Sequence, residues 1–164
     1  LDKNDQALQY YKKIISGYPN SSYLPEAMLG EAQVYYNLQQ DDRALAGFKN
    51  VISKYPGTKQ SREALEQVRT IYLNQNKTDE FLAYARTVPE ADVSTAAQDS
   101  LIYESAELRY TQGNCDKAVA DFEGYLKRFP DGQFAVNANY YRSDCLYRNK
   151  KYEEALPGFE FVIS

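Results

Sequence analysis

The sequence predicts an all-α fold of about nine helices that pair as antiparallel neighbours. Four alanines, Ala7, Ala44, Ala118 and Ala155, are separated by 37, 74 and 37 residues, which is one period of 37 with one unit lacking its alanine. An aromatic residue follows each alanine by four positions, and a proline follows three of them by twelve. No stretch shows the alternation of polar and apolar residues, bounded by turn residues, that is typical of strands.

Each repeat unit ends in a helix that a proline stops. Phe48 and Val51 lie four and seven residues after their alanine, so the three apolar side chains share one helix face. The proline that follows lacks an N–H and forces the preceding residue out of the helical conformation. Ser21, Ser22 and Thr58 come just after such prolines, and we expect these side chains to cap the next helix.

The units follow one another along a single array. A first helix precedes each alanine-anchored helix, as at residues 24–38, where Met28, Ala32 and Tyr35 share a face. The sequence predicts a half unit with only a second helix at 1–19, followed by a full unit at 20–56 and an irregular unit at 57–89. A second full unit follows at 90–130, and the last unit, at 131–164, lacks its proline. Because a repeat buries its core only against its neighbours, we expect this array to be a fragment of a longer chain. Self-association through the truncated ends is a further expectation.

The third unit departs from the pattern. Phe81 stands where the alanine is expected, and Arg69 replaces the small residue of the first helix. Pro56 and Pro89 are 33 residues apart, whereas Pro89 and Pro130 are 41 apart, so the second helix loses about one turn and the next connection gains it. Either this is neutral drift, which loops tolerate at small cost, or it marks a bend or a loop that contacts a partner.

These residues resemble the tetratricopeptide-repeat family, with its small residues at Ala32 and Ala106, its second-helix alanines and its terminal prolines. The resemblance implies a right-handed superhelical solenoid whose first helices line a concave groove. The family's unit is ~34 residues long, and this period is three longer. The longer unit, with its Tyr-Pro or Phe-Pro junction, is similar to repeats of bacterial outer-membrane-assembly lipoproteins and of a Tol–Pal-associated periplasmic protein. This similarity implies a periplasmic or cell-envelope location, with the cytoplasm as the alternative.

The resemblance also implies a non-catalytic scaffold for protein–protein interaction, whose partner is a protein or peptide. The implied groove residues are Gln33, Tyr36, Asn37, Glu66, Asn74, Tyr103, Glu107, Tyr110, Tyr140, Asp144 and Tyr147. This set is rich in tyrosine and acid, so a neutral to basic partner segment is expected. The tyrosines either anchor that segment, since Tyr offers large contact area at low entropic cost, or pack against neighbouring first helices.

Family members that clamp an acidic C-terminus use groove cations. The equivalent positions here are Leu29, Glu66, Tyr103 and Tyr140, which provide no cation. Binding of an acidic C-terminus in that manner is therefore not expected. Two alternatives to a groove-binding scaffold stay open, an architectural or self-associating spacer and an accessory domain of a larger enzyme.

Composition argues against several other classes. The 164 residues include no histidine, which excludes a Ser-His-Asp triad, and no GxxxxGK[ST] motif is present. The net charge of −4, with scattered Lys and Arg, argues against nucleic-acid binding, and no apolar run is long enough for a membrane span. Neither a cofactor nor a metal is expected. Cys115 and Cys145 lack zinc-site spacing, so Cys145 serves either as a small buried hydrophobe, which we favour, or in a disulfide with Cys115.

Overall fold

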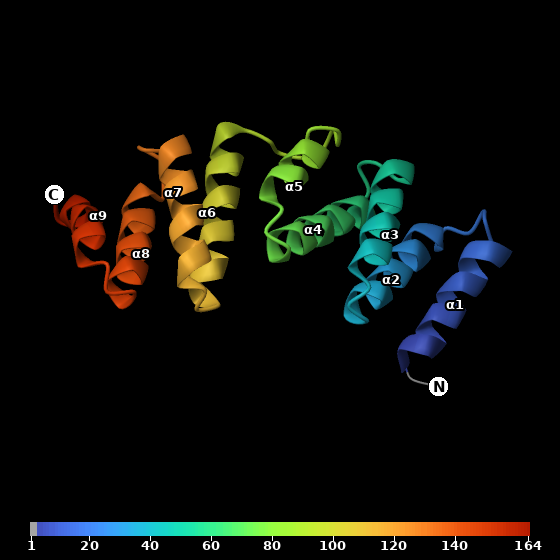
Figure 1. The fold of residues 1–164 in the computed structure, drawn as a ribbon. Coiled ribbons are helices and arrows are strands. Elements are labelled where there is room, and N and C mark those ends of the chain that lie inside the picture. Colours follow the sequence, from blue (N-terminus) through green and yellow to red (C-terminus); the bar gives the residue numbers. More distant parts are fainter. Residues whose placement is uncertain (1–2) are drawn as a thin grey trace. The chain divides into compact units, whose positions relative to one another are not determined.

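A computed structural model describes residues 3–164 of the chain. Within these residues it contains nine α-helices and no β-strand (Figure 1). The helices are α1 (Lys3–Gly17), α2 (Leu24–Asn37), α3 (Asp41–Lys54), α4 (Lys59–Asn74), α5 (Thr78–Ala85), α6 (Thr95–Thr111), α7 (Cys115–Arg128), α8 (Ala135–Arg148) and α9 (Tyr152–Ile163). The predicted all-α repeat fold is confirmed.

The ends of the second helices agree with the positions of the prolines in the sequence. The second helices α1, α3, α5 and α7 each end two to four residues before Pro19, Pro56, Pro89 and Pro130, respectively. In the third repeat, where the sequence predicts a shortened second helix and a longer connection, α5 has eight residues and α6 begins at Thr95. None of the described helices is both long enough and apolar enough to cross a membrane.

The capping predictions are right at one junction and wrong at the other. Thr58 is the N-cap of α4, and its hydroxyl accepts a hydrogen bond from the Ser61 N–H at 3.1 Å. Neither Ser21 nor Ser22 caps α2, because the chain makes a turn there and α2 begins after Tyr23, which forms no side-chain cap. A proline in the first turn of α2 instead removes an N–H that would otherwise need a partner.

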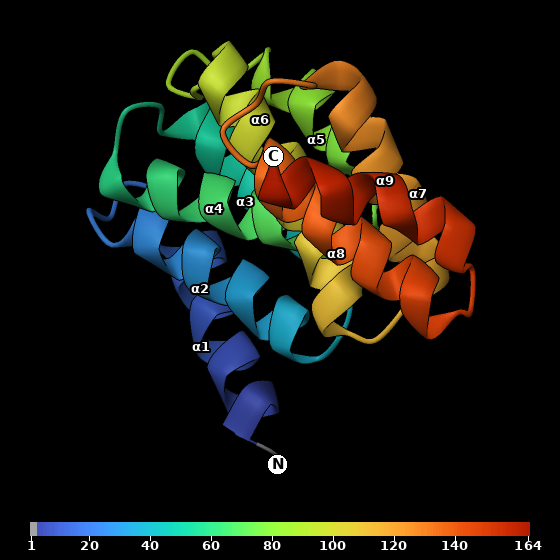
Figure 2. The same ribbon diagram turned by 90° about the vertical axis from the view of Figure 1, so that its left-hand side faces the viewer.

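The chain divides into two compact units, whose helices Figures 1 and 2 show from two sides. Unit 1 comprises the residues up to Gln75 together with Ala83–Ala91, and unit 2 comprises Asn76–Leu82 and Asp92–Ser164. In unit 1 the predicted core residues Ala44, Phe48 and Val51 of α3 are fully buried.

Close packing of the unit 1 helices depends on small residues. A Cβ placed on Gly47 of α3 would lie 2.8 Å from the Cβ of Ala32 in α2. Real Cβ atoms do not approach so closely, so the glycine lets the two helices come together.

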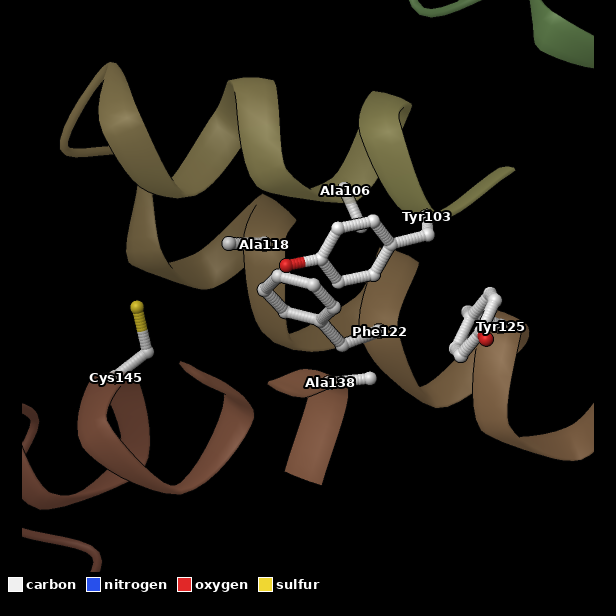
Figure 3. Close-up of a cluster of buried hydrophobic side chains, with 7 residues drawn as sticks. All are labelled: Tyr103, Ala106, Ala118, Phe122, Tyr125, Ala138 and Cys145. Atoms are coloured by element: carbon white, nitrogen blue, oxygen red, sulfur yellow. The ribbon is translucent and has the colours of Figure 1, made fainter. Parts of the chain in front are cut away.

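The core of unit 2 is rich in aromatic rings. Tyr103 of α6 packs with Phe122 and Tyr125 of α7, next to Ala138 of α8 (Figure 3). Phe122 and Tyr125 are both 0% exposed. Aromatic pairs of this kind contribute about 1 kcal/mol beyond the burial of their area.

A disulfide joins the two cysteines of unit 2. Cys115, the first residue of α7, is bonded to Cys145 near the end of α8. The sequence left this bond open, and the reading of Cys145 as a free buried hydrophobe is corrected. Cys145 is indeed buried, but its sulfur is bonded to that of Cys115.

A buried polar network fixes the connection between α7 and α8. The Tyr125 hydroxyl donates to Asp99 Oδ1 of α6 at 2.5 Å and accepts the Phe134 N–H at 3.1 Å. Asp99 Oδ2 accepts the Gln133 N–H at 2.9 Å. Since both Asp99 and Tyr125 are buried, these bonds hold the loop before α8 against α6.

Candidate functional site

In each compact unit the first helices carry polar side chains, on α2 and α4 in unit 1 and on α6 and α8 in unit 2. We call each of these the first-helix surface of its unit. In unit 2 its centre is a connected set of three side chains. The Tyr110 hydroxyl of α6 donates to Asp144 Oδ2 of α8 at 2.8 Å and accepts from Arg148 at 3.1 Å. Arg148 also pairs with Asp144 at 2.6 Å, one helical turn away. The set holds Asp144 in one orientation, because its carboxylate is bound from two directions.

The environment of this set perturbs the Tyr110 phenol. Partial burial raises the pKa of Tyr110 above its usual value, and the hydrogen bond to the Asp144 carboxylate raises it further. The guanidinium of Arg148 lies 5.3 Å from the ring centre and acts in the opposite direction. Tyr110 is therefore a neutral hydrogen-bond donor at physiological pH.

Two exposed tyrosines flank Asp144 along α8. Tyr140 is 46% exposed and Tyr147 is 57% exposed, and their seven-residue separation puts both on one helix face with Asp144 between them. Each ring is braced by a ring of α9, Tyr140 by Phe159 at 6.1 Å and Tyr147 by Tyr152 at 5.2 Å. These amphipathic rings are therefore held in place and accessible at the same time.

Tyr103 does not belong to this exposed surface. It is 4% exposed, and Phe134 from the loop before α8 stacks on its ring with centroids 4.4 Å apart. Burial, followed by the hydrogen bond that its hydroxyl donates to Glu107 at 2.7 Å, raises the pKa of Tyr103 above its usual value. The packing alternative holds for this ring, and the expectation that Tyr103 offers an accessible anchor is corrected. Glu107 is half-buried beside it.

In unit 1 the first-helix surface is hollowed rather than ridged. An open hollow of about 380 Å³ lies where α1, α2 and α4 meet. It is lined by Tyr11, Glu26, Leu29, Gly30, Gln33, Glu63, Glu66 and Gln67. The structure thus brings the predicted residues Gln33 and Glu66 together. Glu66 is exposed, and within the described residues no hydrogen bond or ion pair engages its carboxylate.

The remaining predicted residues of unit 1 lie outside this hollow. Asn37 is exposed and accepts a hydrogen bond from the Gln33 amide at 3.1 Å. Tyr36 is half-buried and Asn74 is exposed at the end of α4. The structure does not bring these three side chains into one pocket.

Several residues of the surface were missed by the sequence reasoning. Tyr11 of α1 reaches the unit 1 hollow because Gly30 of α2 leaves room, since a Cβ there would lie 2.5 Å from the Tyr11 ring. Glu63 precedes Glu66 by three residues and Gln67 by four on α4, and this helical spacing was a signal available in the sequence. Within residues 3–164, no three acidic or cysteine side chains gather as a metal site requires.

Comparison with known families agrees with the helix pairs and the small-residue contacts. The tetratricopeptide-repeat family matches residues 103–160 and, through a second form of the repeat, residues 1–21 and 26–58. Together these segments make up more than half of the chain, which therefore belongs to the tetratricopeptide-repeat family. No curated protein sequence matches the chain.

Solved structures with a similar arrangement of helices are distant in sequence. MamA from Desulfovibrio magneticus RS-1 is 16% identical with a TM-score of 0.48, and the match covers 99% of this chain and 85% of that one. YrrB, described as a tetratricopeptide-repeat protein with an unusual peptide-binding site, is 16% identical with a TM-score of 0.47, covering 99% and 77%. A tetratricopeptide-repeat protein from Parabacteroides merdae is 19% identical with a TM-score of 0.47, covering 98% and 58%.

Proposed function

We propose that this chain is a non-catalytic protein-interaction scaffold that binds a partner peptide or protein on its first-helix surface. The observation that carries the proposal is the strip of α8 where Tyr140 and Tyr147 stand exposed on either side of Asp144. Tyrosines that are braced from behind lose little entropy on binding, and such residues dominate the energy of protein interfaces. Membership of a repeat family, in which consecutive units build extended binding surfaces, supports the same function.

The partner segment that suits this surface is neutral to basic. Glu66 offers a carboxylate without an ion pair within the described residues, and Glu107 and Asp144 add acidic groups in unit 2. Arg148 is the cation on this strip, and it is engaged by Asp144 and Tyr110. A basic side chain of the partner would therefore meet acceptors, whereas an acidic one would meet a cation that is already paired.

The proposed location is the periplasm or cell envelope of a bacterium. The disulfide between Cys115 and Cys145 supports it, because disulfides persist in oxidising compartments and are rare in the cytosol. Labelling of free thiols in the natural cells, with and without prior reduction, tests this location. Two blocked cysteines are expected, and reactive thiols in the untreated protein would contradict it.

The binding proposal is tested by affinity capture from envelope extract with a matched pair of variants. Tyr140→Ala with Tyr147→Ala removes the two rings of α8, while Tyr10→Ala with Tyr23→Ala removes two exposed tyrosines elsewhere and serves as the control. Circular dichroism first checks that both variants stay helical.

We expect the α8 variant to lose a captured partner at least tenfold, since two interface tyrosines at more than 1 kcal/mol each exceed that factor. The control should keep that partner. Equal capture by the two variants, or a partner lost only from the control, would refute a binding role for the α8 strip.

A further inference from the structure

A second hollow lies on the second-helix side of unit 1, away from the first-helix surface. Its walls are α3 from Ala46 to the residues before Pro56, and the segment from Tyr84 to Glu90. The volume is about 630 Å³. Ile52 at 4% exposed and Val88 at 7% exposed form an apolar floor. We call this hollow the outer groove.

One end of the outer groove carries a cation without an acidic partner. Lys49 Nζ lies 4.5 Å from the centre of the Tyr84 ring and donates to the Tyr72 hydroxyl at 2.7 Å. Within residues 3–164 no carboxylate forms an ion pair with Lys49. An ammonium group has three donors, so two remain for an incoming acceptor. A positive charge held against aromatic and apolar walls favours an anionic ligand group.

The other end of the outer groove carries the opposite charge. Glu90 Oε1 lies 3.7 Å from the position that a Cβ of Gly57 would take, so the carboxylate stands beside the end of α3. Glu90 is exposed, and no ion pair engages it within the described part of the chain. The carbonyl end of α3 adds to the negative potential there. A ligand cation therefore fits this end.

The two charges are spaced like side chains of an extended peptide. Lys49 lies five residues before Lys54, the last residue of α3, which along the helix is about 7.5 Å, and the Glu90 carboxylate stands just beyond that end, next to Gly57. A peptide in the extended polyproline II conformation rises ~3.1 Å per residue with three residues per turn, so side chains three positions apart lie on the same side, about 9 Å from each other. A segment with an acidic and a basic residue three positions apart would reach both ends while placing an apolar side chain between them.

We propose that the outer groove docks a short extended peptide segment of a partner protein, with a carboxylate at Lys49, an apolar side chain over Ile52 and Val88, and a cationic side chain at Glu90. The contacts are made by side chains, so the peptide can lie in either direction. This site shares no residue with the first-helix surface and stands independently of the function proposed for it.

The test uses the isotope-labelled full chain and four blocked hexapeptides, titrated while backbone amide shifts are followed by NMR. GELAKG carries both charges and the apolar residue. GKLAKG and GELAEG each replace one charge, and GESSKG lacks the apolar residue. We expect GELAKG to shift the amides of the groove and to bind about fivefold more tightly than each of the other three peptides.

Charge-reversal variants make the assignment specific. Lys49→Glu should change the preference to GKLAKG and Glu90→Lys should change it to GELAEG. The double variant should again prefer GELAKG, because the peptide can reverse its direction. Equal affinity for all four peptides, or an unchanged preference in both single variants, would overturn the proposal.

A blocking variant confirms where the peptide lies. Ala46→Arg fills the groove from an exposed position of α3, and Ala83→Arg places the same side chain on an exposed position of α5 that does not line the groove. The first should abolish the shifts caused by GELAKG and the second should leave them intact, both variants keeping dispersed amide spectra. Shifts that persist in Ala46→Arg would overturn the location.

Discussion

Replacing Tyr125 by phenylalanine tests the buried network that fixes the loop before α8. The substitution removes only the hydroxyl, which donates to Asp99 at 2.5 Å and accepts from the Phe134 N–H at 3.1 Å. Both Tyr125 and Asp99 are buried, so water cannot replace these bonds. A hydrogen bond to a charged group contributes ~1.5 to 3 kcal/mol and a neutral one ~1 kcal/mol. We therefore expect Tyr125→Phe to lower the free energy of unfolding by about 2 to 4 kcal/mol.

The matched control is Tyr103→Phe in the same aromatic core. Its hydroxyl donates to Glu107, which is only half-buried, so the loss should be nearer 1 kcal/mol. Urea denaturation followed by circular dichroism measures both variants, with fluorescence as a second probe because repeat arrays can unfold in steps. If Tyr125→Phe is no more destabilising than Tyr103→Phe, the network does not stabilise the loop as argued.

Three further predictions concern the stability of the fold. Replacing both Cys115 and Cys145 by alanine should lower the free energy of unfolding by about 3 to 4 kcal/mol, because the disulfide closes a loop with a sequence separation of 30 and so restricts the unfolded chain. Urea denaturation with and without reductant measures this loss. Gly124→Ala should stabilise α7 by up to ~1 kcal/mol, because open space surrounds this position. Gly47→Ala should destabilise the fold, because Ala32 blocks the new methyl group. Thermal melts should therefore show a higher melting temperature for the first variant and a lower one for the second. Burial, and next the hydrogen bond to Asp99, raises the pKa of Tyr125 above the usual tyrosine value of 10.0, so the unfolded chain ionises first and the free energy of unfolding should fall as pH rises above about 10. Urea midpoints that stay constant from pH 8 to 11 would contradict this.

The helix pairs were predictable because their signal is local. The signal is an alanine followed at helical spacing by an aromatic and an aliphatic residue, such as Phe48 and Val51, and then by a proline. This pattern involves only residues that are close together along the chain. Burial of Tyr103 was not predictable, because Phe134, from a loop 31 residues later, covers its ring. The disulfide likewise depends on α7 and α8 bringing two Cα atoms to 5.1 Å, which a spacing of 30 residues does not reveal.

Part of the candidate site did have an unused signal. A hydrogen bond between consecutive sequence repeats recurs at a separation of 34 residues, which is the repeat period of 37 residues less about one helical turn. Tyr110 with Asp144, Glu26 with Gln60, Asp41 with Gln75 and Asp99 with Gln133 all follow it. Acceptors and donors at that separation could have been paired from the sequence. The geometry of these hydrogen bonds could not have been predicted from the sequence, since it depends on how each side chain is packed.

The irregular third repeat has a physical explanation in two positions at which the preceding repeat brings its helices together. In the preceding unit Ala32 faces Gly47, and the equivalent positions 37 residues later are Arg69 and Tyr84. Two large side chains cannot occupy a contact in which even a Cβ would lie 2.8 Å from its neighbour. The second helix of that unit therefore cannot pack in the same way, and α5 ends after eight residues. The Tyr84 ring instead lies beneath Lys49 Nζ and forms a wall of the outer groove, so one of the residues that break the repeat also helps to form the groove.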